Sequence, residues 1–180
     1  MVMSAKWLIF LVLPACLLPP AVDEVATPVN QPPRIDPVTL SPSPAMGPIF
    51  MSIDCNAYRF YATITDPDPD DTIYWRVFLD YHRDRRRLFT EVKSLAPDPG
   101  QTNEGRSLLF TVYPNDERFK DGDLTYTEPH TVELLVADRG FFDGPEPQAR
   151  TVDPDGLIAS FVWPVQLGTT ADPGCVVGTP

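Results

Sequence analysis

The densest group of possible metal ligands is a short acidic stretch, Asp66-Pro67-Asp68-Pro69-Asp70-Asp71. Its carboxylates are hard oxygen ligands of the kind that Ca²⁺ prefers. However, it lacks the glycine at the sixth position and the closing glutamate at the twelfth that an EF-hand loop requires. Proline and aspartate also favour ordinary surface turns. Two interpretations therefore remain open, a calcium site and a turn without metal.

Groups for acid–base or nucleophilic catalysis are few. The two histidines are His82, in an arginine-rich loop, and His130, which heads a predicted strand and would satisfy a loop carbonyl there. No G-x-S-x-G nucleophile turn occurs, and neither histidine has a Cys or Glu at zinc-ligand spacing. We therefore predict that the protein is not an enzyme. The alternative is a hydrolase or carbohydrate-active protein that uses a pair of loop carboxylates.

One basic concentration stands out in an acidic chain. It consists of Arg83, Arg85, Arg86 and Arg87. Guanidinium groups could bind an acidic partner, a lipid headgroup or the carboxylates of a polysaccharide. The other interpretation is a solvated loop whose arginines pair with nearby acids such as Asp80 and Asp84, since exposed ion pairs are common and weak.

The N-terminus has the proportions of a signal peptide. Lys6 precedes an apolar run from Trp7 to Leu13, which is far shorter than the roughly 20 residues of a transmembrane helix. The sequence Leu13-Pro14-Ala15-Cys16 that follows resembles the lipobox of bacterial lipoproteins. The resemblance implies cleavage before Cys16, acylation of its thiol by chains such as palmitate, and attachment to a membrane. Leu17, in place of Asp, implies the outer membrane.

The alternative at the N-terminus is a conventional signal peptide cleaved between residues 20 and 25, which would discard Cys16. If Cys16 instead carries lipid, Cys55 and Cys175 remain as a pair in an oxidising compartment. A disulfide between them would close a loop of more than a hundred residues and stabilise the fold by up to about 4–5 kcal/mol. The alternative is two reduced or mispaired thiols.

Alternating apolar residues predict the strands that must position these groups. The stretches 58–65 and 73–80 flank the acidic turn, which makes that turn a sandwich corner. Further strands are predicted at residues 38–40, 49–53, 88–92, 107–113, 130–138 and 157–167. Loops fill 96–105, 114–129 and 139–155, and Pro164 marks the last strand as an edge or a bulge.

Short strands joined by turn-rich loops predict an all-β, Ig-like β-sandwich. The opening Asn30-Gln31-Pro32-Pro33-Arg34-Ile35, the D-P-D after the strand at 58–65, and the H-x-V-x-L-x-V-x-D pattern at 130–138 resemble PKD and cadherin-like Ig-like domains. The W-x-F-G-D-G sequence of PKD domains is absent at Trp75–Asp80. In an Ig-like sandwich the loops at 66–71 and 138–143 share one end, so Asp138 and Asp143 would join the calcium ligands. The full set of aspartates is then Asp66, Asp68, Asp70, Asp71, Asp138 and Asp143.

Composition limits the function classes. The chain has 180 residues, 22 prolines against 10 glycines, and a net charge of −11. The prolines fit short strands with stiff connections, and the negative charge disfavours nucleic acid, whose phosphates it would repel.

The sequence therefore predicts a signal peptide at residues 1–15, a lipid-anchored flexible tether at 16–31, a sandwich domain at 32–168 and a C-terminal tail at 169–180. It predicts an outer-membrane lipoprotein of the bacterial envelope, periplasmic or surface-exposed, that displays a non-catalytic module for adhesion, assembly or envelope structure. No cofactor is expected unless the acidic turn binds Ca²⁺, which would make a calcium-stiffened module. The expected partners are the membrane and an envelope protein or polysaccharide.

Overall fold

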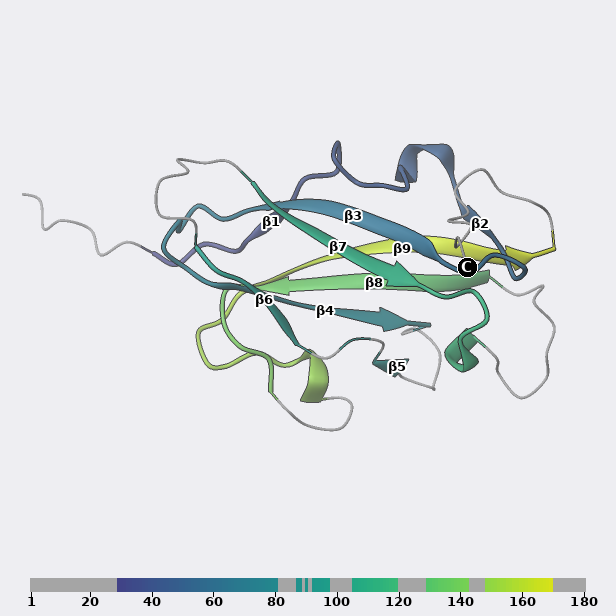
Figure 1. Cartoon of the computed structure of the whole chain (residues 1–180). Helices are drawn as coiled ribbons and strands as arrows, with labels where there is room; N and C mark the ends of the chain where they lie inside the picture. Colours follow the sequence, from purple (N-terminus) through teal and green to yellow (C-terminus); the bar gives the residue numbers. More distant parts are fainter. Residues whose placement is uncertain are drawn as a thin grey trace, which may run out of the picture.

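A computed structural model describes residues 29–80, 87–88, 90, 92–97, 105–119, 129–142 and 148–169. Two β-sheets pack face to face, with their strands running between two ends of an elongated domain (Figure 1). The first sheet has the order β1-β3-β7, and the second the order β2-β9-β8-β4-β5, with β6 also paired to β4. The all-β sandwich predicted from the sequence is confirmed.

The strand bounds follow the alternating patterns closely. In the first sheet they are β1 Arg34–Ile35, β3 Tyr58–Thr65 and β7 Arg106–Val112. In the second sheet they are β2 Ile49–Ser52, β4 Ile73–Leu79, β5 Arg87–Leu88, β6 Lys93–Leu95, β8 Pro129–Ala137 and β9 Ile158–Gly168. Three 3₁₀ turns are described, η1 Pro44–Met46, η2 Glu117–Phe119 and η3 Gln148–Arg150.

The topology is that of an Ig-like sandwich. The first, third and seventh strands form one sheet, while β4, β8 and β9 form the centre of the other, as the A, B, E and C, F, G strands do in that fold. All described strand pairs are antiparallel except β2 with β9, which is parallel. Because β1 belongs to the first sheet and β2 to the second, the chain crosses from one sheet to the other between them.

The core lies between the sheets and is rich in aromatic rings. Phe60 of β3 stacks on Phe110 of β7 at 5.1 Å, and Trp163 of β9 meets Phe60 edge-on at 5.2 Å. Trp75 of β4 packs near Phe110 at 6.2 Å, in the strand position where Ig-like sandwiches carry a buried tryptophan. These rings join the two layers because each comes from the inward face of its strand.

Two sequence predictions about strands need correction. Val38 and Leu40 do not form the first strand: residues 37–39 make a turn in which the Asp36 carboxylate accepts a hydrogen bond from Val38 N at 3.0 Å. The short β1 lies just before this turn. Of the stretch predicted as a strand at 88–92, Leu88 ends β5, and β6 begins only at Lys93. These two short strands pair with different parts of β4.

The outer face of β4 and β8 is covered as well. Phe78, Leu135 and Ala137 point away from the main core and form a second apolar cluster with Phe141 and Ala149. The covering segment, residues 139–142 and 148–157, is called the flap here. It was predicted only as loop, yet it contains η3 and a bridge that pairs Phe141 with Val152.

Pro164 lies inside β9 where a missing N–H does little harm. It is opposite Thr131 of β8, and β2 begins its pairing one residue later, with Ile49 opposite Val165. Among the described strands, the stretch of β9 up to Pro164 is therefore paired on one side only, in agreement with the edge interpretation. Within the described part of the chain, no helix has the length and apolar character needed to cross a membrane.

Candidate functional site

The acidic turn between β3 and β4 is a hydrogen-bonded corner. The Asp66 Oδ1 accepts a hydrogen bond from Asp68 N at 3.0 Å, and Asp71 N donates to Asp68 O at 3.0 Å. These are the local bonds by which aspartate side chains form turns. β3 and β4 belong to different sheets, so the turn connects the layers.

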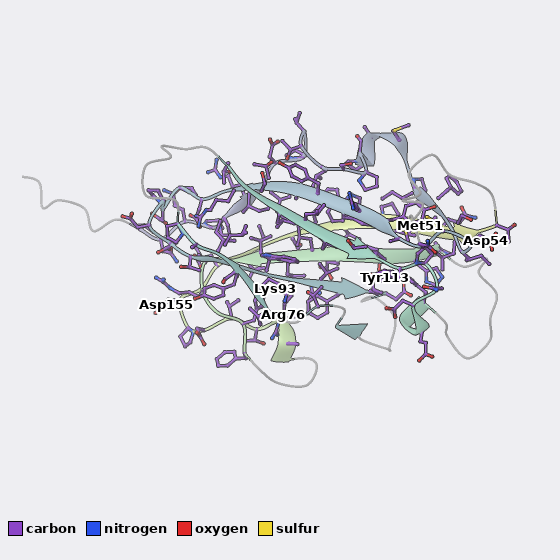
Figure 2. The ribbon with its side chains drawn as sticks, viewed as in Figure 1. Met51, Asp54, Arg76, Lys93, Tyr113 and Asp155 are labelled. Atoms are coloured by element: carbon purple, nitrogen blue, oxygen red, sulfur yellow. The ribbon has the colours of Figure 1, made fainter. Side chains whose placement is uncertain are left out.

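The chain enters the domain beside this turn and is bound there. The Asn30 amide donates to Asp138 Oδ2 at 2.8 Å and to the Asp155 carbonyl at 3.1 Å, while Gln31 N donates to Asp68 Oδ2 at 2.9 Å. We call this end of the sandwich, with the acidic turn, Asn30, Asp138 and Asp155, the acidic pole. Figure 2 shows Asp155 at this end and Tyr113 and Asp54 toward the other.

Two arginines lie among the carboxylates of the acidic pole. Arg106, at the start of β7, donates to the carbonyls of Asp71 at 2.7 Å and Leu95 at 3.2 Å. Arg139 lies 3.7 Å from the Asp71 carboxylate in a half-exposed ion pair. Partial burial lowers the pKa of Arg106, an effect that the nearby Asp66 and Asp71 partly offset.

Asp66 is a partly buried carboxylate in the acidic turn. Its pKa is raised because burial disfavours the charged form, although the Asp68 N–H and the Arg106 charge act in the opposite direction. Its Oδ2 is buried without a hydrogen-bond partner.

The structure brings Asp138 to the same pole as the acidic turn but gives it a structural contact. Its side chain is buried, with 1% of the residue exposed, and Oδ1 accepts from Leu157 N at 2.8 Å while Oδ2 accepts from Asn30. Asp70 is exposed. Across the described residues, no three or more His, Cys, Asp or Glu side chains form a group that could hold a metal ion. Because Asp138 is buried, it does not form a water-exposed pair of carboxylates with the acidic turn. Asp143 lies outside the described residues.

A buried carboxylate–imidazole pair lies at the opposite end of β4. His130 Nδ1 is 2.7 Å from Asp80 Oδ2, and Thr131 N donates to Asp80 Oδ1 at 2.9 Å. Asp80 has a φ of 52°, a left-handed conformation that aspartate tolerates better than most residues. The edge of Phe119 of η2 packs on the His130 ring at 5.2 Å. Asp80 was one of the acids that the second interpretation paired with the arginine cluster; its described contacts are those with His130 and Thr131, and the side chains of that cluster lie outside the described residues.

Two arginines fasten the flap to the outer face of the second sheet. Arg150 binds Glu133 of β8 through two hydrogen bonds, one of them 2.8 Å long, and lies over the Phe78 ring. Arg76 of β4 donates to the carbonyls of Phe142 at 3.1 Å and Ala149 at 2.8 Å. Figure 2 shows Arg76 directed from β4 toward the flap.

Several predicted site residues cannot be placed. Cys16, Cys175 and His82 lie outside the described residues, and so do the arginines at positions 83, 85 and 86 and the side chain of Arg87. Cys55 is described: it is buried just after β2, with its Sγ 3.3 Å from the Ala57 carbonyl.

Sequence reasoning missed the buried ionic contacts, although a signal for them existed. The run Leu134-Leu135-Val136-Ala137 is apolar on both faces of its strand, and Phe78 sits on the face of β4 that the alternation assigned outward. A strand that is apolar on both faces is covered on both faces. The charged Arg76 and Glu133 on that covered face then require partners.

Comparison with models of known protein families gives no match, and neither does comparison with curated proteins.

Proposed function

We propose that the protein is a lipoprotein, anchored to the outer membrane of a bacterial envelope through Cys16, whose Ig-like module acts by contact and not by catalysis. The observation that carries this proposal is the Leu13-Pro14-Ala15-Cys16 sequence, which resembles a lipobox directly after an apolar signal-like run. Because one acyl chain binds a membrane only marginally, the several chains of a lipoprotein give stable attachment.

The geometry of the acidic pole supports the proposal that the anchored chain presents the sandwich domain in a fixed orientation. Asn30 and Gln31 make three hydrogen bonds to three separate parts of this pole. A chain that arrives from an anchor at Cys16 would thus meet the sandwich at a fixed place. The acidic pole then faces the membrane, and the end with Asp80 and His130 faces away from it.

The alternative of a hydrolase rests on the loop carboxylates. Two facing carboxylates in contact with water would favour that alternative. The buried, doubly bonded Asp138 and the turn-forming Asp66 and Asp68 favour a structural use of these groups instead.

We also propose that Cys55 and Cys175 form a disulfide. Support comes from the place of Cys55, which is buried, and from Ile53 N, which donates to Gly168 O at 2.8 Å and so holds Cys55 close to the end of β9. From Gly168 to Cys175 is seven residues, an extended reach of up to about 23–25 Å. Peptide mapping of the unreduced protein should yield a linked Cys55–Cys175 peptide. A peptide that links Cys55 to Cys16 would contradict both this pairing and the lipid anchor.

Labelling with a radioactive fatty acid tests the anchor. Cells that express the full-length wild type should incorporate label into the protein, and Cys16→Ser should abolish it. Cys55→Ser serves as the matched control, since it removes a different thiol and should keep the label. Absence of label in the wild type would overturn the anchored function and favour a secreted protein.

A further inference from the structure

We propose that the outer edge of β7 pairs with β7 of a second copy of this chain. β7 is the last strand of the first sheet, and within the described residues its other edge has no partner strand (Figure 1). All seven of its residues pair with β3 in an unbroken register from Arg106 opposite Ile64 to Val112 opposite Tyr58. Its backbone is thus held straight and ready to accept a further strand.

The other edge strands of the sandwich differ from β7. β1 and β5 have two residues each, β6 has three and β2 has four. The stretch of β9 that pairs with β8 alone ends in Pro164. Short edges are one of the ways in which proteins avoid unwanted pairing, alongside charged side chains, proline and bulges along the strand. β7 uses none of these beyond its first residue, Arg106, whose guanidinium turns away to the carbonyls of Asp71 and Leu95. An edge of this length without protection favours an intended partner.

The sequence of β7 is complementary to itself. Its midpoint is Leu109, which is 56% exposed on the outer face. A two-fold axis at this residue would place Leu109 opposite its own copy and Ser107 opposite Thr111. Apolar pairs and hydroxyl pairs stabilise an antiparallel ladder, whereas like charges destabilise it. No residue of β7 carries a carboxylate, so this edge avoids the repulsion that a net charge of −11 causes elsewhere on the surface.

Antiparallel pairing determines how the two copies point. β7 starts at the acidic pole, where Arg106 binds the Asp71 carbonyl, and runs toward the opposite end (Figure 1). A two-fold axis through Leu109 therefore places the two acidic poles at opposite ends of the dimer. The chain enters each domain at that pole through Asn30 and Gln31. The dimer would then join two facing surfaces, and not two neighbours on one membrane. This orientation deepens the proposed function and rests on it, whereas the strand pairing itself does not.

Sedimentation equilibrium of the full-length protein in detergent tests the pairing. The wild type should show a monomer–dimer equilibrium, and Leu109→Lys should weaken it at least about tenfold by placing two ammonium groups on the axis. Phe50→Lys is the matched control, because Phe50 is 54% exposed on the edge strand of the other sheet, and it should leave the equilibrium unchanged. Circular dichroism checks that both variants are folded.

A cysteine cross-link gives a second measurement that does not depend on a charged variant. Leu109→Cys should form a disulfide-linked dimer under mild oxidation, since directly opposed residues approach to about 4.5–5.5 Å between Cβ atoms. Phe50→Cys should not. A monomeric wild type, an equilibrium unaffected by Leu109→Lys, or capture of a foreign strand by a monomer would each overturn the proposal.

Vesicles separate this inference from the proposed function. Vesicles that carry the lipidated full-length protein should aggregate with one another, and Leu109→Lys should abolish the aggregation. Cys16→Ser should keep the dimer in solution but lose the aggregation of vesicles. A dimer in solution without fatty acid labelling would therefore contradict the proposed lipid anchor and leave the proposed strand pairing intact.

Discussion

Asp80 has a left-handed backbone conformation, and its buried carboxylate pairs with His130. The carboxylate is 8% exposed, and its oxygens bind His130 Nδ1 and Thr131 N. A buried carboxylate that loses a partner keeps the full cost of its desolvation. His130→Ala should therefore lower the free energy of unfolding by about 2–4 kcal/mol, measured by urea denaturation.

A double-mutant cycle isolates this contact from the loss of the ring. Asp80→Asn is the partner variant, because asparagine tolerates a positive φ and its carbonyl can still accept from Thr131 N. If the two groups interact as described, the double variant should lose less stability than the sum of the single variants. Simple additivity would show that His130 acts only by packing against Phe119.

Asp66 should make stability depend on pH. Burial raises the pKa of its carboxyl group above the unfolded value, so the folded state favours the protonated form. The contribution of Asp66 to stability is therefore largest below the unfolded pKa, about 3.9, and it decreases as the pH rises through the interval up to the folded pKa. Asp66→Asn should be more stable than the wild type at pH 7, by less than about 1 kcal/mol because the site is half exposed. The gain should vanish below pH 3.9 in denaturation curves across pH, and a gain that persists there would contradict this origin.

The flap is an element that two arginines attach to a sheet. Glu133 of β8 is 4% exposed and bound by both nitrogens of Arg150. Arg150→Met would leave its carboxylate buried without that partner, and should cost about 3 kcal/mol. Hydrogen exchange should rise in the flap more than in β3 and β7, which belong to the other sheet.

The matched variant for the flap is Arg150→Met combined with Glu133→Gln. It removes both charges and keeps the volume, so it should recover part of the lost stability, since replacing a buried pair costs less than breaking it. If the double variant is as unstable as the single one, the flap depends on the aliphatic packing of Arg150 over Phe78 and not on the charge pair.

Strand positions were predictable because the alternation in each strand reports which face is buried. Val132, Leu134 and Val136 were assigned inward, and all are fully buried. One prediction of a strand failed where a hydrogen bond between near neighbours in sequence outweighed the apolar alternation. Asp36 caps the turn at Val38 and ends β1 early, and no periodicity announces such a cap. The flap was missed because its bonds link residues far apart in sequence, such as Arg76 and Ala149.

The location of the candidate site was predictable from the sequence, but the contacts that its carboxylates make were not. Shared loop ends of an Ig-like sandwich correctly brought Asp138 near the acidic turn. The contact that the Asp138 carboxylate makes depends on Asn30, which was assigned to the tether and yet binds Asp138 directly. A side-chain amide that reaches across more than a hundred residues of sequence leaves no local signature.

At the scale of the whole molecule, the two ends of the sandwich differ in charge and in bonding. The acidic pole collects the turn at 66–71, Asp138 and the entering chain, while the other end buries Asp80 with His130. Among the described strands, β7 has an outer edge without a partner strand, and this edge runs along the side of the sandwich between the two ends.

Added calcium should have little effect on this arrangement. Oxygens of Asp66, Asp68 and Asp138 already accept hydrogen bonds within the pole, and a Ca²⁺ ion needs six to eight oxygen ligands. A site that used Asp68 and Asp138 as ligands would have to compete with the contacts of Gln31 and Asn30. We therefore expect millimolar Ca²⁺ and Mg²⁺ to change the melting temperature equally and slightly, as measured by scanning calorimetry. A rise that is specific to Ca²⁺ and is lost in Asp66→Asn would contradict this and establish the calcium-stiffened alternative. Asp116→Asn is the matched control, because Asp116 lies after β7, away from the acidic turn, and its substitution should leave any response to Ca²⁺ unchanged.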